Sequence, residues 1–261
     1  MRARTRLTSL AGAVAALLMV AAPADAGQTT PPPDPAPGGP QRPYEPDVPG
    51  PENIDSLTAS VTPDGGTARG VRVAFDRSSR AEPEGPPAAA RRFVFLFDRS
   101  LVFRPEAFPT CSRATIEEHS LAACPKNSVV AEGTSHLYPE GRTEVYAVNT
   151  RHPGGARGAL VVIPASDTAL ELTWERVSDP YRKRGYRWAL DEILPPGDTP
   201  PEERVGTRRF ELTWGATRRL GDRTVSFAES TARPGDKLRI GLWSEFVTGQ
   251  VVLPETTAVR P

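Results

Sequence analysis

Basic and aromatic side chains lie close together in one stretch of the 261-residue chain, from residue 181 to residue 188. Cationic groups beside aromatic rings can bind anionic polymers or sugars, because the charges attract anions and the rings offer flat apolar faces. The candidate ligand-binding residues are Tyr181, Tyr186, Trp188, Arg182 and Arg184. An ordinary strand explains the spacing more simply, since Tyr186 and Trp188 would share one face and Arg187 the other. The basic side chains would then be a solvated strand face.

Two glutamates offer the carboxylate pair that glycoside hydrolysis needs. Glu171 and Glu211 begin the two copies of the sequence Glu-Leu-Thr-Trp, at 171–174 and 211–214. A hydrolase needs its two carboxyl groups ~5 or ~9 Å apart, and these two could face one another across a sheet. Solvent-facing residues opposite arginines are the simpler interpretation. The chain has no Gly-x-Ser-x-Gly turn and no phosphate-binding glycine loop, so we assign no catalytic residue.

The three histidines do not predict a metal site. His119, His136 and His152 are not at paired ligand spacing, and no His-Glu-x-x-His motif occurs. His119 follows Glu117 and Glu118, which a solvated helix face explains better than a metal cluster does. No metal and no cofactor is therefore expected.

The two cysteines are most simply a disulfide. Cys111 and Cys124 enclose twelve residues, and a pair of this kind in a secreted protein is usually bridged. Metal ligation together with His119 and redox chemistry are the alternatives. The spacing is not that of a Cys-x-x-Cys site, and two cysteines cannot build a four-cysteine zinc site.

Three segments of the sequence carry a resemblance to a known group of proteins. They are Phe97-Asp98-Arg99, the stretch Phe108-Pro109-Thr110-Cys111-Ser112, and the stretch from Cys124-Pro125 to Gly133-Thr134. Together these resemble a group of secreted actinobacterial proteins of unknown function, over about residues 90–135 of this chain. The resemblance implies a secreted, β-rich fold with a disulfide at this place, and it implies no catalytic residues.

The N-terminal residues predict export and then a tether. Residues 1–26 resemble a secretory signal peptide: arginines precede an apolar run of 13 residues from Leu10 to Ala22, and Ala24-Asp25-Ala26 supplies small residues for cleavage. An uncleaved anchor is the alternative. Residues 27–52 hold ten prolines. Since proline has no amide donor and a fixed φ, we expect an extended, disordered linker there.

Residues 53–261 predict one β-rich domain, because apolar residues recur at every second position in many short segments. Two segments, Phe93–Phe97 and Leu160–Ile163, are apolar at every position and are typical of strands covered on both faces. The sole helix candidate is Arg113–Ala123, which Ser112 could cap. We therefore expect an all-β fold, an antiparallel β-sandwich or jelly roll, with one short helix in the Cys111–Cys124 loop. Trp174 and Trp214 are expected to point into its core, and a platform on which a ligand stacks is the alternative.

Charge and composition limit the functions open to such a domain. The chain has 32 basic and 32 acidic residues, and a net charge of zero argues against binding nucleic acid. No second apolar run is long enough for a membrane span after cleavage. The sequence thus favours a secreted or envelope-associated protein without enzymatic activity, with a structural or binding role and a cell-envelope glycan or protein as its partner. The alternative is an exported carbohydrate-active enzyme on a jelly-roll scaffold.

Overall fold

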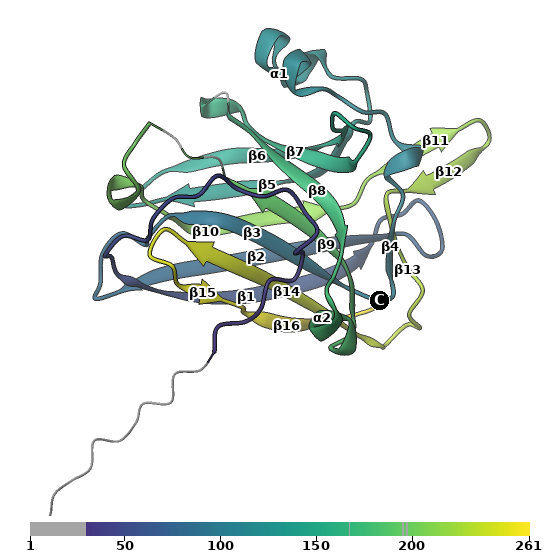
Figure 1. Cartoon of the computed structure of the whole chain (residues 1–261). Coiled ribbons are helices and arrows are strands. Elements are labelled where there is room, and N and C mark those ends of the chain that lie inside the picture. The colour runs from purple at the N-terminus through teal and green to yellow at the C-terminus, as the bar shows by residue number, and fades with distance from the viewer. Residues whose placement is uncertain (1–29, 167, 195, 197) are drawn as a thin grey trace, which may run out of the picture. The chain divides into compact units, whose positions relative to one another are not determined.

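A computed structural model of the chain describes residues 30–261 except 167, 195 and 197 (Figure 1). The expected signal peptide lies outside these residues. Within residues 31–261, which form one unit, the structure contains the following elements. The strands are β1 Glu52–Pro63, β2 Val71–Glu82, β3 Ala90–Asp98, β4 Leu101–Phe103, β5 Val129–Leu137, β6 Arg142–Arg151, β7 Arg157–Ile163, β8 Thr168–Arg176, β9 Tyr186–Ile193, β10 Thr207–Trp214, β11 Thr217–Leu220, β12 Arg223–Ser226, β13 Ala228–Ser230, β14 Lys237–Phe246, β15 Val251–Val252 and β16 Glu255–Val259. The helices are α1 Arg113–His119, α2 Asp179–Lys183 and the short 3₁₀ turns η1 Pro105–Ala107, η2 Leu121–Ala123, η3 Pro164–Ser166 and η4 Pro201–Glu203.

One 12-stranded antiparallel sheet forms most of the domain. Its strand order is β1-β2-β10-β5-β6-β7-β8-β9-β3-β14-β15, and β16 pairs with β14. The sheet curls until distant strands face each other, since Phe75 of β2 and Phe95 of β3 have ring centroids 5.2 Å apart. The expected all-β, antiparallel sandwich-like fold is confirmed, in the form of a single, nearly closed sheet. No helix in the described part of the chain is long and apolar enough to cross a membrane.

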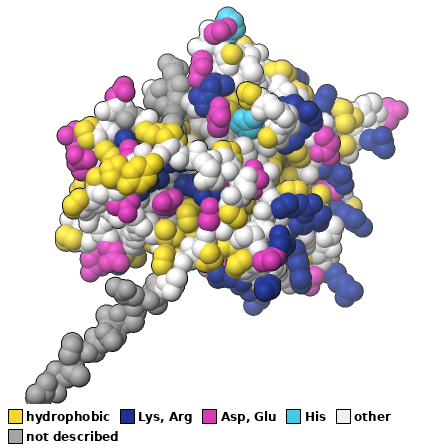
Figure 2. Space-filling view, viewed as in Figure 1, with side chains coloured by type: hydrophobic (Ala, Val, Ile, Leu, Met, Phe, Trp, Pro, Cys, Tyr) yellow, Lys and Arg dark blue, Asp and Glu magenta, His cyan; other side chains and the backbone are white. Residues whose placement is uncertain are grey.

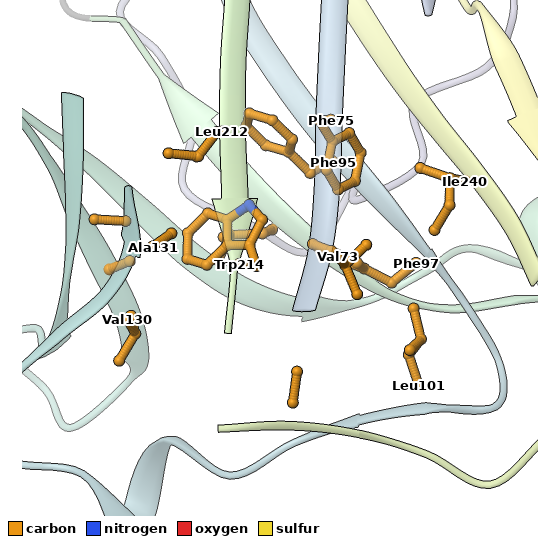
Figure 3. Close-up of a cluster of buried hydrophobic side chains, with 14 of the residues drawn as sticks. Val73, Phe75, Phe95, Phe97, Leu101, Val130, Ala131, Leu212, Trp214 and Ile240 are labelled. Carbon is orange, nitrogen blue, oxygen red and sulfur yellow. The ribbon is translucent and has the colours of Figure 1, made fainter. Parts of the chain in front are cut away.

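The interior of the curled sheet holds the main core (Figure 3). Alternate residues of the strands point into it, as the two-residue period predicts, and Phe75, Phe97 and Trp214 are at most 1% exposed. Trp174 and Trp214 both pack in this core, with ring centroids 6.2 Å apart. The inward orientation expected of the two tryptophans is therefore confirmed, and several edge-to-face aromatic pairs lie in this core.

The disulfide loop covers the outer face of β6 and β7. Cys111 and Cys124 are bonded, which confirms the predicted disulfide. Ile116 of α1 packs with Leu160 and Val162 of β7, so the second face of the Leu160–Ile163 strand is buried under this loop. The Ser112 side chain accepts a hydrogen bond from Thr115 N at 3.1 Å and caps α1, as expected.

The proline-rich segment, residues 31–50, covers the outer face of β3 instead of extending into solvent as the predicted linker would. Ala36 is fully buried in a cluster that includes Val94 and Leu96 of β3. Carbonyl groups of the segment accept hydrogen bonds from side chains of the domain: Pro32 O from Trp243 Nε1 at 3.1 Å, Pro33 O from the Tyr181 hydroxyl at 2.6 Å and Asp34 O from Ser178 Oγ at 3.1 Å. Proline has no N–H to donate but keeps its carbonyl acceptor, so this segment can satisfy buried donors without joining the sheet.

Candidate functional site

A bulge in β9 separates the aromatic residues of the basic–aromatic stretch. Trp188 lies opposite Phe97 and Tyr186 lies opposite Asp98, so Arg187 has no partner on β3. The extra residue sends Tyr186 to the outer cluster with Val94 and Leu96, while Trp188 packs against the main core. The expectation that Tyr186 and Trp188 share one face is wrong for this reason.

The two tyrosines of the stretch are buried and hydrogen-bonded inside the protein. Tyr181 is 1% and Tyr186 2% exposed. The Tyr186 hydroxyl donates to Glu255 Oε1 at 2.7 Å. Burial raises the pKa of Tyr181 to about 12, and burial together with the bond to Glu255 raises the pKa of Tyr186. Neither ring offers a face to a ligand.

The basic residues of the stretch remain on the surface over α2, where Figure 2 shows Lys and Arg side chains gathered. Arg182 donates to Val177 O at 2.8 Å and pairs with Asp179, and Arg184 pairs with Glu255. The structure thus divides the five candidate residues among an outer cluster, the surface and the main core. Of the five, Trp188 lines a pocket in the described part of the chain.

That pocket, here called the Trp174–Trp188 pocket, opens where β4, β7, β8 and β9 meet at one end of the curled sheet. Its volume is about 270 Å³, and its lining consists of Phe103, Pro105, Glu106, Arg157, Trp174 and Trp188. Three of these six residues are aromatic and two are charged. Apolar walls with a few polar groups are the usual composition of a small-molecule site.

Neighbouring side chains pack against the two tryptophan rings of this pocket and fix their positions. Trp174 stacks at a tilt on Phe103, with centroids 4.4 Å apart, and touches Phe97 at 5.7 Å in the core. The guanidinium of Arg176 lies 3.9 Å from the Trp188 ring centroid and fixes that ring from one side. Trp174 Nε1 is buried and has no hydrogen-bond partner among the described residues. The pocket therefore presents rigid aromatic faces.

The structure does not bring Glu171 and Glu211 together. Glu171 on β8 accepts from Arg113 Nε at 2.9 Å, and Glu211 on β10 accepts from Thr134 Oγ1 at 2.9 Å. Three strands, β5, β6 and β7, lie between β10 and β8 in the sheet. The two carboxylates cannot act on one glycosidic bond, and Glu171 has the solvent-side ion pair with an arginine that the sequence favoured.

The histidines lie in three separate places. His119 is exposed beside Glu118, His136 lies 3.3 Å from Glu211, and His152 contacts the carbonyl oxygen of Leu172 at 2.8 Å. Across residues 30–261, apart from 167, 195 and 197, no three His, Cys, Asp or Glu side chains are grouped as metal ligands.

One functional candidate was missed by the sequence analysis: Glu192 on β9, which is 3% exposed. It lies between Phe93 of β3 and Leu172 of β8 in the sheet register. Burial in these apolar surroundings, with a smaller contribution from the charge of Asp191, raises the pKa of Glu192 to about 8. The signal was present, since Glu192 stands two residues after Leu190 and so falls on the inward face of its strand.

Comparison with known proteins adds no assignment. No known protein family matches the chain, and no curated protein is significantly similar to it.

Proposed function

We propose that the protein is an exported, non-enzymatic binding protein that holds a sugar unit of a cell-envelope glycan in the Trp174–Trp188 pocket. The observation that carries the proposal is the convergence of two tryptophans with Arg157 and Glu106 around about 270 Å³ of open space. A pyranose ring has apolar C–H faces and a rim of hydroxyl groups. Flat aromatic walls can take the faces, and charged side chains at the edge can take the hydroxyls.

The fixed positions of the two tryptophan rings favour a binding role for them over a role in core packing alone. Half-buried Trp174 and Trp188 are fixed by Phe103 and Arg176, so little side-chain entropy is lost when a ligand arrives.

Export is supported by two features at different places in the chain. The N-terminal sequence has the charged start, apolar run and small residues of a signal peptide. The Cys111–Cys124 disulfide fits an oxidising compartment such as the cell exterior.

Binding without hydrolysis is the better supported of the two alternatives. The pocket has one carboxylate, Glu106, whereas the usual glycoside hydrolase mechanism uses two. The two glutamates considered from sequence lie on strands that three others separate. An exported carbohydrate-active enzyme therefore has no carboxylate pair at the pocket.

The test is a glycan array probed with the mature domain, residues 27–261, beside an assay for release of reducing ends from every glycan that binds. We expect retention of a subset of envelope glycans with no product. Replacing Trp188 by Ala should weaken that binding at least about tenfold, as loss of a central aromatic contact usually does. Tyr44→Ala is the matched control, because Tyr44 is 91% exposed and lies outside the pocket.

Two results would overturn the proposal. One is unchanged glycan binding by Trp188→Ala while near-ultraviolet circular dichroism shows an intact fold. The other is turnover of a bound glycan by the purified domain.

A further inference from the structure

A second cavity lies inside the curled sheet near β9, β3 and β10, and it is separate from the Trp174–Trp188 pocket. Its volume is about 110 Å³. Its lining includes Arg77, Phe93, Phe95, Glu192, Phe210 and Leu242, and none of its lining residues lines the first pocket. Leu194, Thr207 and Phe210 are only half-buried, so the cavity lies near the surface.

Of the two ionisable side chains that line this cavity, Arg77 and Glu192, Glu192 is the one without a partner. Glu192 lines the cavity, is 3% exposed, and makes no hydrogen bond or ion pair with any described residue. A buried carboxyl group without a partner is costly to a fold and is uncommon unless a ligand or a proton completes it.

The charged groups around the cavity are already paired with each other. Arg77 is held by Asp55 through two hydrogen bonds of 2.7 and 3.0 Å, and both side chains are at most 2% exposed. Behind Glu192, Asp191 receives two hydrogen bonds from Arg92, each 2.7 Å. The Arg77–Asp55 pair is neutral as a whole, and Arg92 is shared by Asp191 and Asp34, so neither group offers an unpaired positive charge to an ionised Glu192.

The walls of the cavity suit a cation better than an anion. Phe93, Phe95 and Phe210 line it, and the rings of Phe95 and Phe210 have centroids 6.3 Å apart. Aromatic faces carry negative potential and attract ammonium groups, as Phe93 already does with the Arg77 guanidinium at 5.0 Å.

We propose that this cavity is a binding site for a small organic ammonium ion, whose charged nitrogen pairs with Glu192 and whose short alkyl part contacts the phenylalanine and leucine walls. The volume limits the ligand, since a cavity of ~150 Å³ is known to hold one benzene ring. A ligand with about four or five heavy atoms fits the smaller space here. The site is independent of glycan binding at the other pocket.

The experiment compares n-propylammonium with 1-propanol, two probes of the same size that differ in charge. Each is titrated into the mature domain, and amide chemical shifts are followed by NMR. We expect saturable shifts confined to β3, β8, β9 and β10 with propylammonium, and binding at least about tenfold weaker with propanol. Glu192→Gln, which keeps the shape and removes the charge, should weaken propylammonium binding by a similar factor. Glu171→Gln on the outer face of β8 is the matched control and should bind like the unmodified domain.

The pH dependence of propylammonium binding tests the ion pair between Glu192 and the ammonium group independently. Because Glu192 must lose its proton to bind the cation, affinity for propylammonium should rise by up to about tenfold per pH unit from about pH 6 to about pH 8. The other charged groups near Glu192 are Arg77, which is paired with Asp55, and Arg92, which is paired with Asp191 and Asp34. Equal binding of propanol and propylammonium would overturn the proposal. So would the absence of saturable shifts, or full affinity in a folded Glu192→Gln variant.

Discussion

Trp243 donates a hydrogen bond from Nε1 to the carbonyl oxygen of Pro32 at 3.1 Å, across 211 positions of sequence. The two residues join the last long strand of the sheet, β14, to the proline-rich segment at the other end of the chain. Trp243 is 4% exposed in the same cluster as Ala36 and Leu96. The proline-rich segment is therefore part of the folded domain and seals the outer face of β3.

This contact makes the stability of the domain depend on the proline-rich segment. Tyr181→Phe removes the hydroxyl that donates to Pro33 O at 2.6 Å, and we expect a loss of ~1 kcal/mol in the free energy of unfolding. Tyr44→Phe is the control, since that side chain is 91% exposed and should change nothing measurable. Urea unfolding of the two variants gives the comparison, and equal stabilities would show that the bond to Pro33 contributes nothing.

Removing residues 27–40 is the larger test of the same segment. The deletion exposes Val94, Leu96 and Trp243 and leaves the Trp243 indole and the Tyr181 hydroxyl without their partners. We expect a loss of ~3 kcal/mol or more, because several buried groups become solvated or unsatisfied together. Calorimetry of the truncated domain would show a lower midpoint of thermal unfolding. An unchanged midpoint would mean that the segment only rests on the surface.

The sequence predicted correctly those features of the fold that depend on residues close together in the chain. The two-residue period placed Val73, Phe75 and Trp214 inside, and the segments without polar residues identified strands covered on both faces. Ser112 marked the start of α1 because its side chain can cap the helix. These properties depend on neighbouring residues alone.

Long-range contacts explain what the sequence did not predict. The linker expectation rested on the missing N–H of proline, but the carbonyl partners of Trp243 and Tyr181 are visible only in the folded chain. Helix α2, which was not expected, had a local signal in Ser178-Asp179-Pro180, a cap residue followed by an acid and a proline in the first turn. The bulge at Arg187 has no such signal, since it arises from the pairing of β9 with β3.

The disulfide should stabilise the domain only under oxidising conditions. Cys111→Ser leaves the loop that carries α1 open, and we expect a loss of ~3 kcal/mol from the entropy of a closed loop of this size. Thermal unfolding with and without a reducing agent is the measurement: the reductant should lower the midpoint of the unmodified domain and leave that of the variant unchanged. Two free thiols in the intact mass of the exported protein would contradict the bridge itself.

Two arginine–aspartate pairs of the same geometry should differ sharply in their contribution to stability. Arg92 binds Asp191 through contacts of 2.7 and 2.7 Å, and Arg209 binds Asp76 through contacts of 2.8 and 2.7 Å. The Asp191 side chain is 0% exposed, whereas that of Asp76 is 33% exposed. Because removal of Asp191 leaves a buried guanidinium with only Asp34 as an ionic partner, we expect Asp191→Ala to cost ~3 kcal/mol.

The surface pair is the control for that prediction. Water solvates Arg209 once its partner is gone, so Asp76→Ala should cost a small fraction of what Asp191→Ala costs. Urea unfolding at low and at high salt distinguishes them further, because salt screens the exposed pair and leaves the buried one unaffected. Equal losses for the two substitutions would show that geometry, and not burial, sets the strength of these pairs.

Glu192 should make the domain less stable as the pH rises. Its pKa is about 8 in the folded chain against an ordinary value of 4.5, so between these values the folded chain holds a proton that the unfolded chain has released. Stability then falls with increasing pH by at most ~1.4 kcal/mol per unit, and it levels off above about pH 8. Glu192→Gln has no proton to lose, so its stability relative to the unmodified domain should grow from about pH 5 to about pH 8 and then stay constant. Urea unfolding of both proteins across this range gives the difference directly. If the difference in unfolding free energy between the two proteins did not change with pH, Glu192 would ionise as easily inside the sheet as in water. The cavity would then hold no uncompensated carboxyl group for a cation to bind.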